Sequence, residues 1–171
     1  QIDATISDIG ADAVKVGMLS NTDIIELVAS KIKEHEIKNV VVDPVMVAKG
    51  GDKLLRDDAV DSLRKVLVPL CTVLTPNLSE ASVLVGHDVK SVEDVRSAAR
   101  AIVDMGARIV VIKGGHLAGD AIDVLFDGHV FSELSAARIQ TRNTHGTGCT
   151  FSSAIAAGLA KGLGVEESVV M

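Results

Sequence analysis

Two short segments of the chain are almost wholly apolar and β-branched: residues 39–43 (NVVVD) and residues 108–115 (RIVVIKGG). Continuous apolar runs of this length are typical of strands that helices cover on both faces, as in parallel sheets. Residues 13–18 (AVKVGM) and 71–77 (CTVLTPN) resemble them and predict two further strands. The pattern therefore predicts a buried, mostly parallel sheet.

The segments between these strands repeat apolar residues at helical spacing, which predicts amphipathic helices. The first such stripe consists of Ile24, Leu27, Val28 and Ile32, and a later one of Val95, Ala98, Ala99, Ile102 and Val103. Strands that alternate with helices predict a layered α/β domain with right-handed crossovers.

Residues 121–134 (AIDVLFDGHVFSEL) break this alternation. Two strand-like segments flank Asp127-Gly128, a dipeptide that favours the positive φ of a hairpin turn. An antiparallel hairpin is therefore expected at one edge of the sheet. We find no internal repeat and no interdomain linker, so residues 1–171 are predicted to form a single domain.

The composition of the chain limits the classes of molecule that the protein is expected to bind. With 171 residues, 47% of them hydrophobic, the chain can bury one substantial core. Its net charge of −6, its pI near 5.3 and its lack of Trp and Tyr argue against nucleic acid as a partner. The oligomeric state is left open, with a homo-oligomer as one alternative.

The sequence also lacks the signatures of secreted and membrane proteins. Cys71 and Cys149 have neither zinc-site spacing nor the pattern of a disulfide framework. No apolar run approaches the roughly 20 residues that span a bilayer, and no targeting segment is present. We expect no membrane partner and a cytoplasmic location, or an organellar one in a plant-like source.

Chemistry is expected where the predicted strands end, because open α/β sheets bind ligands beyond the carboxyl ends of their strands. The residues at those ends are Gly17-Met18, Asp43-Pro44, Thr75-Pro76-Asn77 and Lys113-Gly114-Gly115.

Residues 142–160 (RNTHGTGCTFSSAIAAGLA) lead from a glycine-rich turn into a predicted helix. Backbone N–H groups at such a helix start can hold phosphate, and Gly146 and Gly148 would allow close approach. The same glycines could instead serve only turn geometry and packing. Cys149 lies in the first turn, where the helix dipole favours a thiolate, although a lone cysteine is often a small buried hydrophobe.

Four further residues fit phosphate chemistry. Lys113 could reach a polyphosphate, or simply extend its ammonium group into solvent. Asn77 and Glu80, three residues apart, could hold Mg²⁺ and its waters, or form a plain capping box. Asp43 could orient another water of the metal, or only begin a turn. Together these groups favour phosphoryl transfer, while P-loop, dinucleotide-binding, GxSxG and HExxH motifs are absent.

Four segments carry a resemblance to a known family: VVVDPVMVAKGGDKLL, LTPNLSEASVLVG, VIKGGH and RNTHGTGCTFSSAIAAGLAKG. In this order and at these separations they resemble the hydroxymethylpyrimidine and phosphomethylpyrimidine kinases of thiamine biosynthesis. That family is part of the ribokinase-like superfamily, and the resemblance runs through essentially the whole chain. It implies a layered α/β/α fold and ATP-dependent, Mg²⁺-assisted phosphorylation of 4-amino-5-hydroxymethyl-2-methylpyrimidine and then of its monophosphate.

The resemblance also implies a role for each matching residue. Gly146, Thr147 and Gly148 match the anion hole, and Cys149 stands where the wider superfamily usually has an aspartate base. Lys113 matches the nucleotide-phosphate lysine. The remaining matches are Asn77 and Glu80 as the metal-binding NxxE, Asp43 as the acidic residue near metal and phosphates, and Met18 and Val45 as walls of the pyrimidine pocket, although Met18 could be ordinary core.

Family members carry an additional N-terminal portion, so the chain is expected to be the larger, C-terminal part of a ribokinase-like kinase domain. Alternatives are a pyridoxal or related vitamin kinase of the same superfamily, and a non-catalytic module that senses a pyrimidine or nucleotide. Fusion to a second enzyme of thiamine biosynthesis is also open.

Overall fold

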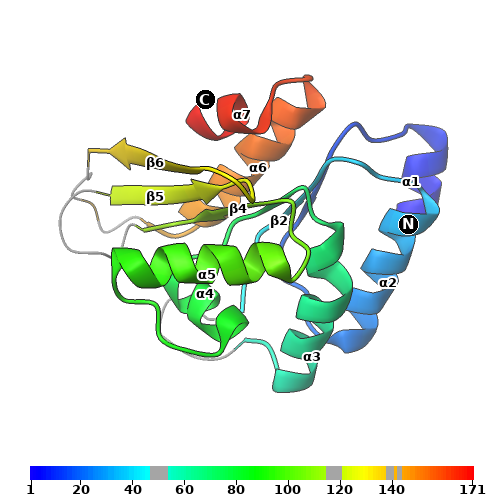
Figure 1. Cartoon of the computed structure of the whole chain (residues 1–171). Coiled ribbons are helices and arrows are strands. Elements are labelled where there is room, and N and C mark those ends of the chain that lie inside the picture. Colours follow the sequence, from blue (N-terminus) through cyan, green and yellow to red (C-terminus); the bar gives the residue numbers. More distant parts are fainter. Residues whose placement is uncertain (47–53, 115–120, 138–140, 142–143) are drawn as a thin grey trace.

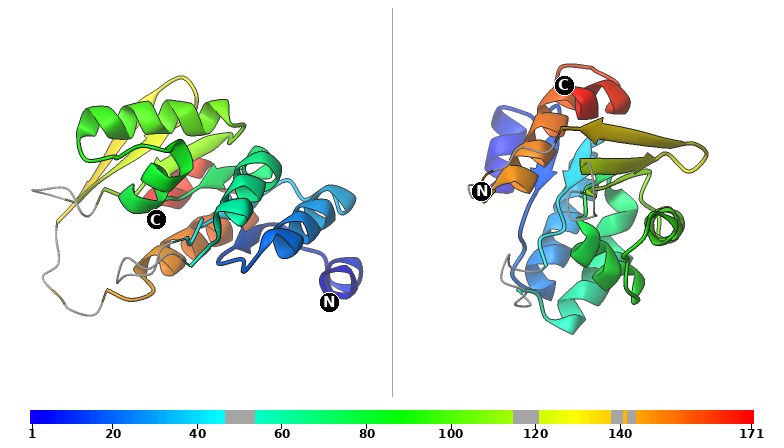
Figure 2. Two further views of the ribbon diagram at one scale, coloured as in Figure 1. Left: turned by 90° about the horizontal axis from the view of Figure 1, so that it is seen from below. Right: turned by 90° about the vertical axis from the view of Figure 1, so that its left-hand side faces the viewer.

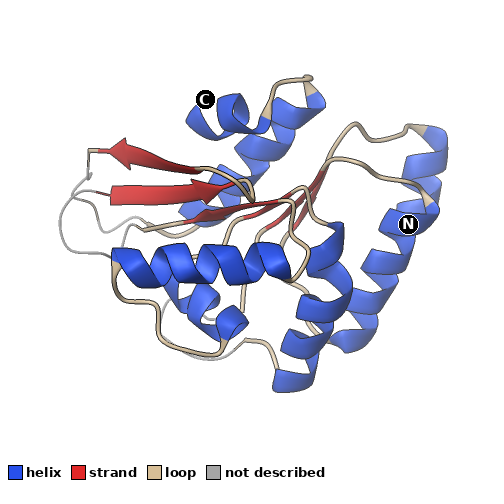
Figure 3. Cartoon of the chain, in the orientation of Figure 1, coloured by secondary structure: helices blue, strands red, loops and turns tan. Residues whose placement is uncertain are grey.

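A six-stranded sheet forms the centre of the protein in a computed structural model that describes residues 1–46, 54–114, 121–137, 141 and 144–171 (Figures 1 and 3). Its strands follow one another across the sheet in chain order. They are β1 (Val14–Val16), β2 (Val40–Val42), β3 (Val73–Leu74), β4 (Ile109–Ile112), β5 (Ala121–Phe126) and β6 (Phe131–Ala136).

The direction of the strands confirms the predicted topology. Strands β1 to β4 are parallel, whereas β5 pairs antiparallel with β4 and β6 pairs antiparallel with β5. The loop between β5 and β6 holds Gly128 at φ +92°, and the Asp127 carboxylate accepts hydrogen bonds from the backbone N–H groups of His129 and Val130. The hairpin predicted around Asp127-Gly128 is therefore confirmed.

Helices cover both faces of the sheet, as Figures 1 and 2 show. Helices α6 and α7 lie on one face, and α2, α3, α4 and α5 lie on the other. The helices are α1 (Ile2–Asp8), α2 (Thr22–Glu34), α3 (Asp57–Ser62), α4 (Leu78–Val85), α5 (Val92–Asp104), α6 (Thr147–Ala160) and α7 (Val165–Val170), with a π-helical turn (Leu63–Leu67) and a 3-10 turn (Val68–Leu70) after α3. The layered α/β/α fold is thus confirmed.

Alternation along the strands divides the buried side chains into two cores. Because successive side chains in a strand point to opposite faces, Val41 packs with α6, while Val40 and Val42 pack with the helices of the other face. The core under α6 also contains Val73, Val111, Leu125, Ile155, Ala156 and Leu159. Any polar side chain two residues beyond Val41, Val73 or Val111 therefore faces α6.

The buried stripe of α5 is as predicted except for Val103, which is half-buried, and that of α2 is as predicted only in part. Val95, Ala98, Ala99 and Ile102 are all buried. In α2 the buried residues are Ile25, Ala29 and Ile32, whereas Ile24 is 38% exposed and Leu27 is 49% exposed. The prediction is confirmed for Ile32, and Val28 packs partly buried against the core, but it was wrong for Ile24 and Leu27. The helix carries two overlapping apolar stripes at helical spacing, and packing against α3 and the following turn selects between them.

No helix within the described ranges has both the length and the apolar character needed to cross a membrane.

Candidate active site

The carboxyl ends of the parallel strands meet at one edge of the sheet, and backbone hydrogen bonds fix their register there. The N–H of Asp43 donates to the carbonyl of Val16 at 2.9 Å. The N–H of Lys113 donates to the carbonyl of Pro76 at 2.8 Å, and Asn77 pairs with Lys113 in an isolated parallel bridge. The residues that follow β2, β3 and β4 are therefore neighbours in space.

Asp43 is the buried charge at this edge, with 2% of its surface exposed. One carboxylate oxygen, Oδ1, lies 3.0 Å from the Lys113 ammonium nitrogen. The other, Oδ2, lies 3.5 Å from the Ser152 hydroxyl of α6, which donates to it. A carboxylate this deeply buried requires such partners, and the ion pair holds Lys113 directly at the end of the sheet.

The first turn of α6 faces this ion pair. Gly146, at φ +80°, precedes the helix in the left-handed conformation that glycine adopts without strain. A Cβ atom on Gly148 would lie 2.9 Å from the Lys113 ammonium nitrogen and 3.9 Å from Asp43 Oδ2. The backbone of the helix start therefore approaches the two charged groups as closely as glycine permits, which suits an anion site.

Asn77 and Glu80 form the capping box of α4. The Asn77 side chain accepts from the Glu80 N–H at 2.9 Å, and Glu80 Oε2 accepts from the Asn77 N–H at 2.8 Å. The interpretation of NxxE as a helix cap is thus confirmed, yet it does not remove Glu80 from the site. Burial raises the pKa of Glu80 to about 7, and the negative charge of Asp43 adds to this increase. The hydrogen bond from the Asn77 N–H and the positive charge of Lys113 lower the pKa, but they do not outweigh burial.

The Glu80 carboxylate accepts from the N–H of Asn77, which pairs with Lys113 in the parallel bridge, so this carboxyl group lies at the same edge of the sheet. The structure thus brings together Asp43, Asn77, Glu80, Lys113 and Gly148, which the sequence had placed at four different positions along the chain. The convergence that the sequence predicted is present for these residues.

The other predicted residues lie at the ends of the same elements. Thr147 and Cys149 are exposed in the first turn of α6, and the Thr147 hydroxyl donates to the Thr144 carbonyl at 3.0 Å. Val45, half-buried, lies two residues after Asp43, and its N–H donates to the Asp43 carbonyl. Met18 is 60% exposed after β1, so its alternative interpretation as ordinary core is wrong.

Sequence reasoning missed three side chains that belong to this edge. Lys15 lies 3.8 Å from Asp43 Oδ2. Asp123 accepts from the Gly114 N–H at 2.8 Å, and burial raises its pKa while Lys113 lowers it. Ser152 is fully buried in α6. A charge inside an apolar strand was the available signal for the first two, since such charges need partners, whereas Ser152 resembles any small residue of a packed helix.

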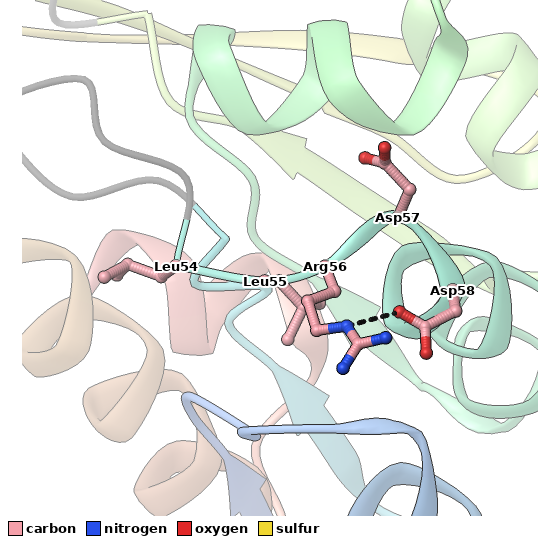
Figure 4. Close-up of a pocket in the computed structure, with 5 residues that line it drawn as sticks. All are labelled: Leu54, Leu55, Arg56, Asp57 and Asp58. Carbon is pink, nitrogen blue, oxygen red and sulfur yellow. Dashed lines mark ion pairs between the residues drawn. The ribbon is translucent and has the colours of Figure 1, made fainter.

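An open pocket of about 550 Å³ lies elsewhere, at the start of α3, and is lined by Leu54, Leu55, Arg56, Asp57 and Asp58 (Figure 4). Its Arg56–Asp58 ion pair, 3.2 Å long, joins side chains that are 84% and 59% exposed. Ion pairs this exposed contribute little, and none of the site residues lines the pocket. We therefore place the functional site at the sheet edge.

A mixed sheet between two helical layers, with charged residues gathered at the carboxyl ends of its parallel strands, defines a ribokinase-like α/β protein. The phosphomethylpyrimidine kinase family matches residues 1–171, and the chain belongs to that family.

Individual relatives agree with this assignment. The hydroxymethylpyrimidine/phosphomethylpyrimidine kinase of Bacillus subtilis (strain 168) is 48% identical over 170 residues, which cover 98% of this chain and 63% of the relative. A pyridoxine kinase from the same organism is 52% identical over 170 residues, covering 97% and 63%. The crystal structure of an ADP complex of Bacillus subtilis pyridoxal kinase superposes with a TM-score of 0.92 at 50% identity, covering 98% of this chain and 64% of that one. The chain thus spans about 63% of the length of these two curated relatives.

Proposed function

We propose that the protein is an ATP-dependent kinase that phosphorylates 4-amino-5-hydroxymethyl-2-methylpyrimidine and then its monophosphate, a step toward thiamine diphosphate. Residues 1–171 would form a single domain, the larger C-terminal part of a ribokinase-like kinase domain. The observation that carries the proposal is the Lys113–Asp43 ion pair at the glycine-rich start of α6. Phosphoryl transfer is catalysed mainly by positioning and by offsetting charge, and this arrangement supplies both.

The nucleotide phosphates would lie at the start of α6. The N–H groups of Gly146, Thr147 and Gly148 are available there as an anion hole, because the first N–H groups of a helix have no partner within it. Lys113 would exchange part of its pairing with Asp43 for the phosphates, and Asn77 lies beside it in the parallel bridge. The ADP complex of the similar Bacillus subtilis pyridoxal kinase supports a nucleotide-binding role.

The acidic groups of the site fit Mg²⁺. Glu80 is 3% exposed, and its pKa is raised to about 7 because burial disfavours the carboxylate. The capping box uses only Oε2 of that carboxylate, so a hard cation near Glu80 and Asp43 would restore the charged form and meet the oxygen ligands it prefers. When bound, Mg²⁺ would offset charge on the transferring phosphoryl group.

Cys149 would act as the base. Its thiolate, at the start of α6, would accept the proton of the acceptor hydroxyl while the oxygen forms its bond to phosphorus and the bond to the leaving ADP breaks. Met18 and Val45 would form apolar walls for the flat pyrimidine ring. The exposure of Met18 and of Cys149 supports contact with a ligand more than with a core.

A pyridoxal kinase activity is the second candidate, favoured by the 52% identity to a pyridoxine kinase. The deciding experiment uses the protein at its natural length with ATP and Mg²⁺, and compares three acceptors: the pyrimidine alcohol, its monophosphate and pyridoxal. We expect a higher kcat/KM for both pyrimidines than for pyridoxal. Equal or greater efficiency with pyridoxal would contradict the substrate assignment, and no ATP consumption with any acceptor would contradict the kinase and favour a sensor module.

A further inference from the structure

Lys15 is a charged residue in the middle of the apolar strand β1. Its neighbours Val14 and Val16 pack into the core under α2 to α5, so Lys15 points to the opposite face, as its register partner Val41 does beneath α6. Only 21% of its side chain is exposed. A lysine this enclosed needs an anionic partner or a function.

The side chain of Lys15 extends along β1 to the edge of the sheet that carries the site. A Cβ atom on Gly17 would lie 2.9 Å from the Lys15 ammonium nitrogen, so the absence of a side chain at position 17 makes room for the charge. Gly17 does not have a positive φ, and any residue could adopt its backbone. A side chain at position 17 would therefore act by moving the flexible end of Lys15 rather than by straining the backbone.

Lys113 repeats this arrangement on the other side of Asp43. Its ammonium nitrogen lies 2.9 Å from the position of a Cβ atom on Gly148, which also lacks a positive φ. The two lysines bracket one carboxylate, with Lys113 at 3.0 Å from Oδ1 and Lys15 at 3.8 Å from Oδ2. Glu80 and Asp123 also lie near Lys113, whereas Lys15 pairs with Asp43 at the longer distance of 3.8 Å, which suits a second anion at its ammonium group.

The two cations belong to different sides of the site. Lys113 follows β4 beside Asn77, on the side proposed for the nucleotide phosphates. Lys15 belongs to β1, which leads through Gly17 into Met18, the residue proposed to contact the pyrimidine. The nucleotide is equally charged in both phosphorylations, whereas the acceptor is a neutral alcohol in the first and a phosphate dianion in the second.

We propose that Lys15 is the cation on the acceptor side of the site, where its ammonium group holds the phosphate of the monophosphorylated acceptor. This assignment rests on the proposed function and deepens it. Lys15 then determines acceptance of the second substrate, while Lys113 serves the nucleotide in both steps.

The test compares Lys15→Met with the native sequence in the protein at its natural length. Removing one charge-assisted contact should lower kcat/KM for the monophosphate by about tenfold to a hundredfold, and for the alcohol by about threefold at most. Gly17→Ala should shift the same ratio in the same direction, because the new methyl group displaces the ammonium group while the charge remains. Lys33→Met, at an exposed position of α2, is the matched control and should leave both acceptors unchanged.

Calorimetric binding of the alcohol and of the monophosphate without nucleotide gives a readout that does not depend on turnover. We expect Lys15→Met to weaken binding of the monophosphate by about tenfold relative to binding of the alcohol. Equal losses for both acceptors would mean that Lys15 acts only through Asp43, and would overturn the assignment while leaving the proposed function intact. Failure of the native protein to bind either pyrimidine would overturn both.

Discussion

At the residue scale, the site depends on carboxyl groups held where water is scarce. Asp43 remains buried because two lysines and a serine hydroxyl surround it. Glu80 is equally buried, but the charges and hydrogen bonds around its carboxylate offset the cost of burial less fully. Its protonated form is therefore favoured until a cation binds. The difference between these two acids is expected to make the stability of the protein depend on pH.

Glu80 is expected to lower stability as pH rises. Its pKa is raised from 4.5 to about 7, so between these values the folded protein keeps a proton that the unfolded chain has released. The contribution is complete below pH 4.5 and is lost as pH rises through about 7, by about 3 kcal/mol at most. Glu80→Gln, which keeps an oxygen for the Asn77 N–H, should flatten this slope in urea unfolding measured without Mg²⁺.

The matched control for that experiment is Glu93→Gln, at an exposed position of α5. It should leave the pH slope of the native protein unchanged. A Glu80→Gln variant with the same slope as the native protein would show that the buried carboxyl does not titrate in this range.

The two cysteines are expected to differ sharply in reactivity. Cys149 is exposed, whereas Cys71 is 3% exposed and burial raises its pKa to about 12. A disulfide reagent should modify Cys149 rapidly in the folded protein and Cys71 only when the protein unfolds. Cys149→Ser should abolish the rapid reaction and lower kcat by about a hundredfold or more, with a smaller change in KM.

Ser153→Ala, on the exposed side of α6, is the control for this variant and should retain both the rapid thiol reaction and turnover. Undiminished turnover in Cys149→Ser would remove the thiol from the mechanism.

At the element scale, α6 needs small side chains on the two sides where other elements pack against it. Its residues Ile155, Ala156 and Leu159 pack against the sheet, and the short helix α7 packs against it on the same face of the sheet. A Cβ atom on Gly158 would lie 2.7 Å from the Cβ of Ser168 and 3.1 Å from its Cα. The run of small residues in α6 thus allows both the sheet and α7 to approach the helix that carries the proposed anion site.

Gly158→Ala is therefore expected to destabilise the protein even though alanine favours helices. The gain in helix propensity is about 1 kcal/mol, but the clash involves the backbone of α7, and overpacking of this kind costs about 1–3 kcal/mol. Denaturant unfolding should show a net loss of about 1–2 kcal/mol. Ala157→Ser, exposed on the same helix, should change stability by less than about 0.5 kcal/mol. If Gly158→Ala proved more stable than the native protein, α7 would be able to move away from the new methyl group without a loss of stability.

At the scale of the whole molecule, the site joins elements from distant parts of the chain. Asp43 and Lys113 are separated by 70 residues, and Asp43 and Ser152 by 109. A ligand held by these groups contacts the ends of β2 and β4 and the start of α6 together. Its binding energy therefore stabilises the fold as a unit.

ADP with Mg²⁺ is expected to stabilise the protein against thermal unfolding. At about a hundred times the dissociation constant the gain is about 2.7 kcal/mol. Lys113→Met should lose most of this ligand-induced gain, whatever its effect on the unliganded protein, and Lys33→Met should keep it. A gain that persists in Lys113→Met would place the nucleotide elsewhere.

The sequence by itself determined the order and type of the elements. Apolar β-branched runs fixed four strands, the Asp127-Gly128 dipeptide fixed the hairpin, and the ends of the strands indicated the edge where charges gather. These features depend on residues close together in the chain, and their physical signals are local.

Where the local sequence allowed several arrangements, the tertiary structure decided which residues are buried and which charged groups are paired. Helical spacing in α2 permits two apolar faces, and only packing selects Ile25 and Ala29 over Ile24 and Leu27. Lys15 becomes a partner of Asp43 only because β1 and β2 pair in register and Gly17 leaves room for its ammonium group. Burial and long-range electrostatics arise when the layers assemble, so no local pattern could supply them.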